Sequence, residues 1–241
     1  MTTSFFPPGL PGTKTVREAV PRRVLLQTPD KTHLITGGII VDGPNSRDLG
    51  NVGDFDVLRA GLIMGKLTAN GRYAPSVICL ITVAYADPAL ELTVGVDCAK
   101  EVQRRLLLLG ALPQALKLTG PPAALGVVAT QAVNVTAIDT GTGILTVDAI
   151  GADSIIGSLV QPADGSETML GVIPDGTGIP VTNQDDTDVD VFSNLLRGGQ
   201  VDADQIVPLD AVTDASLRTF IKITQLNSLG DFSYDEDYHP S

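Results

Sequence analysis

The chain has 241 residues and a net charge of −12, from 28 acidic and 16 basic side chains. Because nucleic-acid affinity is built from clustered lysines and arginines, this balance argues against a nucleic acid as partner. Neither a signal peptide nor a membrane-spanning apolar run is visible, so we expect synthesis in the cytoplasm without export.

Hydrophobic residues make up 43% of the chain and aromatic residues only 4%, while 25 glycines and 16 prolines are spread along it. This composition favours many short strands and turns, so we predict a mostly β fold with few long helices. Cys79 and Cys98 are the only cysteines, too few for a four-ligand zinc site or a disulfide framework. We expect two buried, inert thiols, with a bridge between them as the less favoured alternative.

Residues 1–21 contain four prolines and two glycines, with Phe5 and Phe6 as the only large apolar pair. Such a segment is hard to fold alone, so it is either a disordered tail or an extended arm. An arm that becomes ordered on a partner would use the two phenylalanines as anchors and its free backbone groups for strand addition.

Residues 22–76 have the pattern of a sheet. Strands are predicted at 24–26 and 39–41, with a glycine turn between them and a polar loop after them. The stretch 57–76 predicts a hairpin whose Asn70-Gly71 turn needs a positive φ angle.

Residues 77–163 begin with strand-like runs at 77–85 and 90–96. A helix is predicted from an Asp97 cap to Leu109, ended by Gly110, with Lys100, Glu101, Arg104 and Arg105 polar. Alternating apolar residues on both sides of 140–143 then predict a hairpin, and further strands are expected around Gly157.

From residue 164 onward we predict a strand at 169–173, an acidic loop at 183–190, and a strand at 191–196 ended by Gly198 and Gly199. Apolar residues at helical spacing predict a helix over 214–229, begun by Asp214. Residues 231–241 form an acidic tail, for which a frayed terminus is the favoured interpretation and docking on a neighbour the alternative.

Two blocks of this sequence carry a resemblance to a known family. The first is LRAGLIMGKLTANGRYAPS at 58–76; the second is DGSETMLGVI at 164–173, followed by NLLRGGQVDA at 194–203 with an Arg-Gly turn. In this order they resemble the head-decoration proteins of lambda-type tailed bacteriophages, which bind the outside of the capsid shell and clamp it. The two blocks cover about a third of the chain, and the resemblance rests on that third.

The resemblance implies a structural virion protein that is not an enzyme and uses no cofactor or metal. Its partners would be the major capsid protein lattice and further copies of itself, as a homotrimer on the exterior of the capsid. It further implies a small β-barrel or β-tulip-like decoration core at 22–76 and 164–208, interrupted by an insertion module at 77–163 and followed by the C-terminal helix and tail at 209–241. The N-terminal arm would bind the capsid through a short apolar set: Phe5, Phe6, Pro7, Pro8 and Leu10.

One motif is compatible with catalysis. Asp139-Thr140-Gly141 is the triplet of retroviral-type aspartic proteases, in which two carboxylates share a proton and activate water. Only 16 residues separate Asp139 from the Ile155-Ile156-Gly157 sequence that resembles the second protease signature, too few for the flap between them. The triplet also suits a hairpin turn. A retropepsin-like protease therefore remains the least favoured alternative, behind another virion component such as a capsid or tail-tube subunit.

Metal and histidine chemistry have little support in the sequence. Asp186, Asp188 and Asp190 have the spacing of the first ligands of a calcium loop, but the required glycine and the twelfth-position glutamate are missing. We expect a solvated acidic loop. The two histidines, His33 and His239, lie far apart in the sequence and outside any cluster of acids or nucleophiles.

Overall fold

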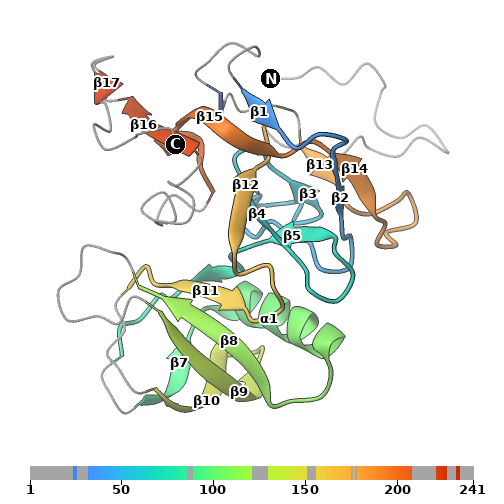
Figure 1. The fold of residues 1–241 in the computed structure, drawn as a ribbon. Coiled ribbons are helices and arrows are strands. Elements are labelled where there is room, and N and C mark those ends of the chain that lie inside the picture. Colours follow the sequence, from blue (N-terminus) through green and yellow to red (C-terminus); the bar gives the residue numbers. More distant parts are fainter. Residues whose placement is uncertain are drawn as a thin grey trace.

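The computed structural model describes residues 24–25, 32–85, 89–120, 130–150, 156–174, 176, 178–207, 221–226 and 232–233. These residues form two lobes, each built around a curled sheet, with one α-helix (Figure 1). The predicted mostly β fold is confirmed. The predicted arm at 1–21, with Phe5, Phe6, Pro7, Pro8 and Leu10, lies outside the described residues.

The first lobe contains a nine-stranded sheet in the order β14-β2-β5-β4-β12-β15-β16-β17, with β1 also paired to β15. Beside it lie a two-stranded sheet of β3 and β13 and a short 3₁₀ helix, η2. Its elements are β1 (His33–Leu34), β2 (Ile39–Val41), β3 (Val57–Leu58), β4 (Ile63–Lys66), β5 (Tyr73–Pro75), β12 (Met169–Val172), β13 (Ile179–Pro180), β14 (Val191–Ser193), β15 (Leu196–Asp202), η2 (Ala203–Gln205), β16 (Ile221–Leu226) and β17 (Phe232–Ser233).

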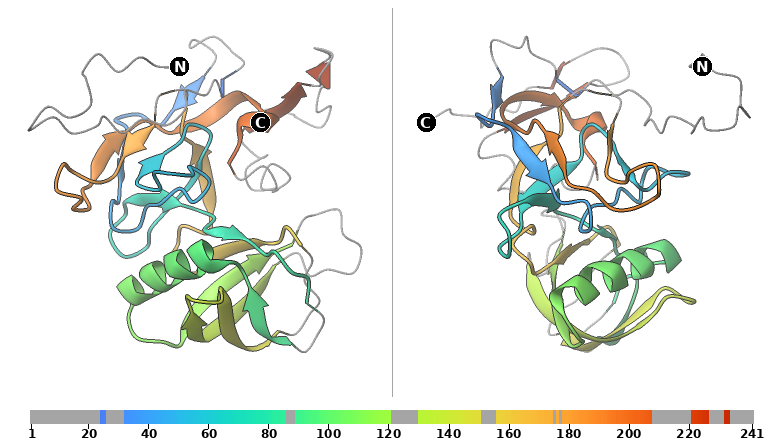
Figure 2. Two further views of the ribbon diagram at one scale, coloured as in Figure 1. Left: turned by 180° about the vertical axis from the view of Figure 1, so that it is seen from behind. Right: turned by 90° about the vertical axis from the view of Figure 1, so that its right-hand side faces the viewer.

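The second lobe is a six-stranded sheet in the order β6-β11-β8-β9-β10-β7, and all of its strands come from residues 79–162. Helix α1 lies across the inside of this curled sheet (Figure 2) and contacts β9, β10 and β11. The elements are β6 (Cys79–Leu80), β7 (Ala89–Thr93), α1 (Val96–Leu109), β8 (Gln114–Thr119), β9 (Gln131–Asp139), β10 (Ile144–Ile150) and β11 (Leu159–Pro162).

The two predicted hairpins are confirmed. In the first lobe, β4 and β5 pair antiparallel, and Gly71 has a φ of +74° in the turn between them. In the second, β9 and β10 pair antiparallel with Val133 and Val135 buried and Asn134 and Thr136 exposed. An alternating pattern has the period of a strand, so one face of this hairpin joins the core of the second lobe and the other faces solvent.

The helix in the second lobe forms where it was predicted, with a different first turn. Gly95 occupies the N-cap position and α1 begins at Val96, so Asp97 lies inside the first turn instead of capping it. An acidic side chain is favourable there because of the helix dipole. Gly110 follows the last helical residue, as predicted. The four polar residues of the predicted helix do not all face solvent. Glu101 and Arg105 are buried, so this part of the prediction is wrong.

The strand predicted at 191–196 is wrong in its boundaries. The structure has a short β14 at 191–193, and β15 then runs through Gly198 and Gly199, where the sequence predicted a turn. The reason is a close approach between strands: a Cβ added to Gly198 would lie 3.1 Å from His33 Cβ on β1. Glycine therefore allows β1 to pair closely with β15 at this point.

The predicted helix at 214–229 is contradicted in its described part, which is the strand β16 running parallel to β15. Ile221 and Ile223 are β-branched and alternate with Lys222 and Thr224, a pattern that also fits a strand. The parallel pairing with β15 decides between the helix period and the strand period in favour of the strand. Residues 214–220 lie outside the described part, as does most of the predicted acidic tail, of which only 232–233 is described, as β17.

Candidate functional site

The two lobes are joined by two short connections, from β5 to β6 and from β11 to β12. Beside these connections lies Arg105, a residue of α1 that reaches from the second lobe to the first. We call Pro75, Arg105, Asp164 and Ser166 the interlobe junction. Two clefts lie between the lobes near this junction, and a disulfide of the second lobe lines the larger of them.

The interlobe junction is a buried ion pair with added hydrogen bonds. Arg105 Nη2 donates to Asp164 Oδ2 at 2.8 Å and to Ser166 Oγ at 2.9 Å, and Nη1 donates to the carbonyl of Pro75 at 2.7 Å. The side chains of Arg105 and Asp164 are 1% and 2% exposed. Asp164 Oδ1 also accepts from the amide and hydroxyl of Ser166. Such a pair is stable only while both charges and their hydrogen bonds are present.

A disulfide connects the same helix to the first strand of the second lobe. Cys79 in β6 and Cys98 in the first turn of α1 are bonded, with their Cα atoms 5.8 Å apart. The favoured expectation of two inert thiols is therefore wrong. Nineteen residues of separation hid the pairing, because only the packing of α1 beside β6 brings the two Cα atoms within bonding range.

The larger cleft has a volume of about 650 Å³ and lies between the lobes. Its walls are mainly aliphatic, with the disulfide on one side and the ion pair of Arg59 and Asp48 on another. Arg59 Nε donates to Asp48 Oδ2 at 2.7 Å. Aliphatic residues from both lobes contribute to the lining: Leu49, Leu62, Val77, Ile78, Leu80 and Ile206.

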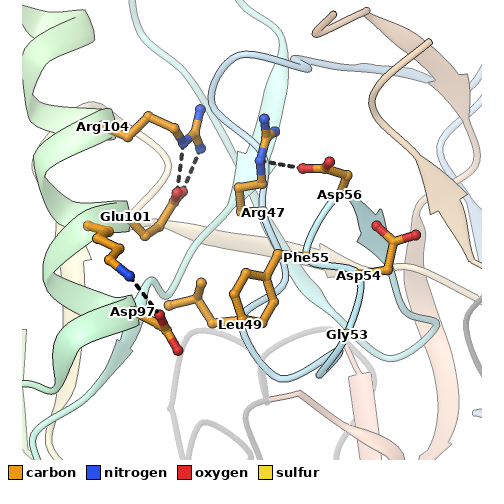
Figure 3. Close-up of a pocket in the computed structure, with 10 residues that line it drawn as sticks. Arg47, Leu49, Gly53, Asp54, Phe55, Asp56, Asp97, Glu101 and Arg104 are labelled. Carbon is orange, nitrogen blue, oxygen red and sulfur yellow. Dashed lines mark hydrogen bonds and ion pairs between the residues drawn. The ribbon is translucent and has the colours of Figure 1, made fainter. Parts of the chain in front are cut away.

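The smaller cleft, of about 400 Å³, lies between α1 and the loop at 47–56. Figure 3 shows Glu101 and Arg104 paired on the helix wall, and Arg47 and Asp56 paired on the loop wall. The charges of the helix wall cancel, while the loop wall also carries Asp54, so the lining has one acidic side chain more than it has basic ones. The cleft offers no concentrated charge of either sign to an ionic ligand.

Two arginines, Arg47 and Arg72, form ion pairs with the acidic loop at 183–190. Asp188 accepts from Arg47 Nη2 at 2.6 Å, and Asp190 lies 2.6 Å from Arg72 Nη1. Two of the three aspartates with calcium-like spacing thus take part in ion pairs, which the expectation of a solvated loop missed. No group of three or more His, Cys, Asp or Glu side chains is placed to hold a metal ion within the described ranges.

Asp139 lies exposed at the β9–β10 turn and accepts hydrogen bonds there. Its Oδ1 accepts from the amides of Gly141, at 2.8 Å, and Thr142, at 3.2 Å. The hydrogen bond from the side chain of Thr142, followed by these two amides, lowers the pKa of Asp139 below its usual 3.8. These contacts are those of a turn residue. Ile156, from the second protease-like sequence, is exposed in a turn.

Several large apolar side chains remain exposed. On the first lobe, Phe192 of β14 and its cross-strand neighbour Ile40 of β2 are 69% and 49% exposed. They lie at one edge of the nine-stranded sheet, where β14 is the last strand. On the second lobe, the three leucines at 107–109 are exposed at the end of α1. Exposed apolar groups of this kind are frequent at protein interaction surfaces.

The structure places the sequence-derived candidates far apart. His33 lies on β1, Asp139 lies at the tip of the second lobe, and His239 is outside the described residues. Sequence reasoning missed Arg105. A signal was present, because Arg105 follows Cys98 and Val102 at helical spacing on the apolar face of α1, and a cation at such a position needs a buried partner.

A comparison of the chain with known protein families, characterised proteins and solved structures finds no match. Among the described residues, no helix is both long and apolar enough to cross a membrane.

Proposed function

We propose that this chain is a structural virion protein that binds the exterior of a mature phage capsid and stabilises it by bridging neighbouring capsid subunits. The proposal begins from the resemblance of the two sequence blocks to head-decoration proteins. One observation supports it most: the two blocks, more than 85 residues apart in the sequence, form adjacent strands. β5 and β4 come from the first block, β12 and β15 from the second, and they follow one another in one sheet.

The contacts between the blocks are close. Met169 and Val172 of β12 are paired with Gly65 and Ile63 of β4, and a Cβ on Gly65 would lie only 2.6 Å from the carbonyl carbon of Ser166. Glycine at residue 65 and the Asp164-Gly165-Ser166 turn are thus matched to each other. This close fit supports the view that the two blocks of the resemblance belong to one structural unit.

The stabilising mechanism is mass action. A protein that binds the assembled shell and not its free subunits stabilises the shell by RT ln(1 + [L]/Kd) for each site. Neither a cofactor nor a catalytic step is needed. By the same resemblance, the binding unit is a homotrimer and the arm at 1–21 is the part that engages the capsid.

The test is co-sedimentation of the purified chain with undecorated, expanded lambda-type capsids, with unexpanded shells as the control. We expect saturable binding to the expanded shells and much weaker binding to the unexpanded ones. Equal binding to both, or no binding to a panel of expanded shells, would contradict the proposal. Assembly of the purified chain alone into shells or tubes would instead identify another virion component.

A further inference from the structure

The disulfide between Cys79 and Cys98 is reachable from solvent. Cys79 is half-buried, Cys98 is 5% exposed, and both residues line the larger cleft. A small thiol or disulfide in that cleft can therefore approach the sulfurs without unfolding of the lobe. Access is one of the conditions that decide how fast thiol–disulfide exchange proceeds.

The bond lies at the start of α1, which has no side-chain cap. The N-cap residue is Gly95, which has no side chain to accept from the free amides of the first turn. A capped start would contribute about 1 kcal/mol to helix stability, and here that contribution is missing. The disulfide fixes this uncapped turn to β6 instead.

The same helix has a second anchor on neighbouring residues. Two turns after Cys98, Arg105 donates to the carbonyl of Pro75, four residues before Cys79. The first turn of α1 and Arg105, one turn before its end, are therefore both attached to residues 75–79, the connection between the lobes. Loss of the disulfide removes one of the two anchors and leaves the wall of the larger cleft attached at one end.

We propose that the Cys79–Cys98 bond is a redox-responsive staple, open as two thiols in a reducing compartment and closed in an oxidising one, which fixes α1 to the interlobe connection. Disulfides persist in oxidising compartments outside the cytosol, whereas cysteines within the cytosol are kept reduced as thiols. The staple is independent of the proposed function, because it follows from the positions of the two cysteines alone.

Closure needs only a small-molecule disulfide as oxidant. The thiolate of Cys79, the more exposed residue, attacks the small disulfide, forms a mixed disulfide and releases one small thiolate. The thiolate of Cys98 then attacks the Cys79 sulfur and displaces the second small thiolate. Two protein thiols are oxidised to one disulfide, and the small disulfide is reduced to two thiols, which take up two protons in place of those that the cysteines lose to solvent.

The expected effect is local and large. Cross-linking residues separated by 19 positions shifts a folding equilibrium by on the order of 100-fold in the chain-entropy account. We expect the first turn of α1 to respond most, because it has no side-chain cap. The β9–β10 hairpin, which lies away from the bond in the sheet order, should respond least.

The test uses the full chain in buffers of reduced or oxidised glutathione. Alkylation followed by peptide mass analysis reports the state of each cysteine, and hydrogen exchange reports the amides of residues 99–102, which donate to the carbonyls at the start of α1, and of the β9–β10 hairpin. The control is the double variant Cys79→Ser and Cys98→Ser in both buffers. We expect an intrachain bond in oxidised glutathione only, and exchange at 99–102 at least about tenfold slower there than in the reduced chain or the variant.

Three results would overturn the staple: free thiols in oxidised glutathione, a bond between two chains instead of within one, or equal exchange at 99–102 in both buffers. The reduced wild-type chain provides the comparison even if the double variant fails to fold.

Discussion

Arg105 carries a full charge into the contact between the lobes, and its partners come from residues 59 and 61 positions later in the chain. Replacing one member of a buried pair leaves the other charge without its partner, at a cost of about 3–5 kcal/mol. A surface pair on the same helix contributes far less. Lys100 and Asp97 supply that comparison, because both side chains are more than half exposed and the pair is of the i,i+3 type.

We predict that Arg105→Met lowers the free energy of unfolding by about 3–5 kcal/mol, because Asp164 stays buried and loses its counter-charge. Urea unfolding followed by circular dichroism measures this change. Lys100→Met is the matched control and should cost less than about 1 kcal/mol. Equal effects of the two substitutions would contradict the assignment of Arg105 to the interlobe junction.

A second prediction at this scale concerns pH. Asp148 is hydrogen-bonded by the backbone and side-chain amides of Asn134, which lower its pKa below 3.8, as Thr142 and its neighbours do for Asp139. Since the folded pKa lies below the unfolded value, this stabilisation is present above pH 3.8 and is lost as the pH falls through the folded pKa. Carboxylate titration by NMR should give midpoints below 3.8 for both.

The double variant Asp139→Asn and Asp148→Asn removes both titrations and keeps an acceptor oxygen at each position. Between about pH 5 and about pH 3, its urea midpoint should therefore fall less than that of the wild-type chain. An equal or larger fall in the variant would show that the two hydrogen-bonded carboxylates are not the source of the pH dependence.

The residue scale also shows where sequence reasoning fails. The Asx-type role of Asp139 could be predicted, because its partners are two and three residues away. The helical spacing of Arg105 from Cys98 and Val102 indicated its burial, but its partners could not be predicted from residues 97–109 alone, because Asp164 and Ser166 come from another part of the chain. The same holds for the two cysteines, whose bond depends on how α1 packs beside β6.

At the scale of single elements, two consecutive leucines of α1 differ sharply in burial. Leu106 is fully buried in the core of the second lobe, and Leu107 is 59% exposed. We predict that Leu106→Ala costs about 2–5 kcal/mol of unfolding free energy, because it leaves a cavity. Leu107→Ala, the control, should change stability by about 0.5 kcal/mol or less. Reversed effects would mean that the helix is rotated about its axis.

The turn at 164–168 depends on Gly165. Its φ is +103°, and an added Cβ would collide with Thr68 Oγ1 and lie 2.7 Å from the Lys66 carbonyl. Gly53 has nearly the same φ, +102°, with nothing within 4 Å of an added Cβ. We predict that Gly53→Ala costs about 1–2 kcal/mol, from backbone strain alone. Gly165→Ala should cost clearly more in the same unfolding assay, and an equal cost would contradict the close packing of this turn on β4.

Local elements could be predicted where the turn residues and the alternation of apolar and polar residues indicate the same structure. The β4–β5 and β9–β10 hairpins and the end of α1 at Gly110 are of this kind. Elements that depend on pairing with distant strands could not be predicted. β15 continues through two glycines, where β1 pairs with it, and β16 is a strand because it pairs in parallel with β15.

At the scale of the whole molecule, the strands of the second lobe lie between the two sequence blocks that carry the resemblance, and the lobe is docked on the first through Arg105. The blocks themselves form neighbouring strands of the first lobe. The sequence could indicate these blocks. It could not indicate the interlobe clefts, because their linings combine residues from both lobes.

We predict that deletion of residues 1–21 abolishes capsid binding and leaves the folded oligomer intact, because the proposed function assigns capsid binding to this arm. Co-sedimentation with expanded capsids measures binding, and light scattering with circular dichroism checks the oligomer. The matched variant is Phe5→Ser with Phe6→Ser, which tests the anchors within a full-length arm. Unchanged co-sedimentation of the truncated chain would show that another surface binds the capsid.

Heat resistance of the capsid tests the central claim most directly. Expanded lambda-type capsids are heated with increasing concentrations of the purified chain, and the temperature at which the shells disrupt is followed by light scattering. Mass action predicts a rise in this temperature that continues with the logarithm of free protein concentration above the Kd. A disruption temperature that stays constant at concentrations that saturate binding would contradict a capsid-stabilising function.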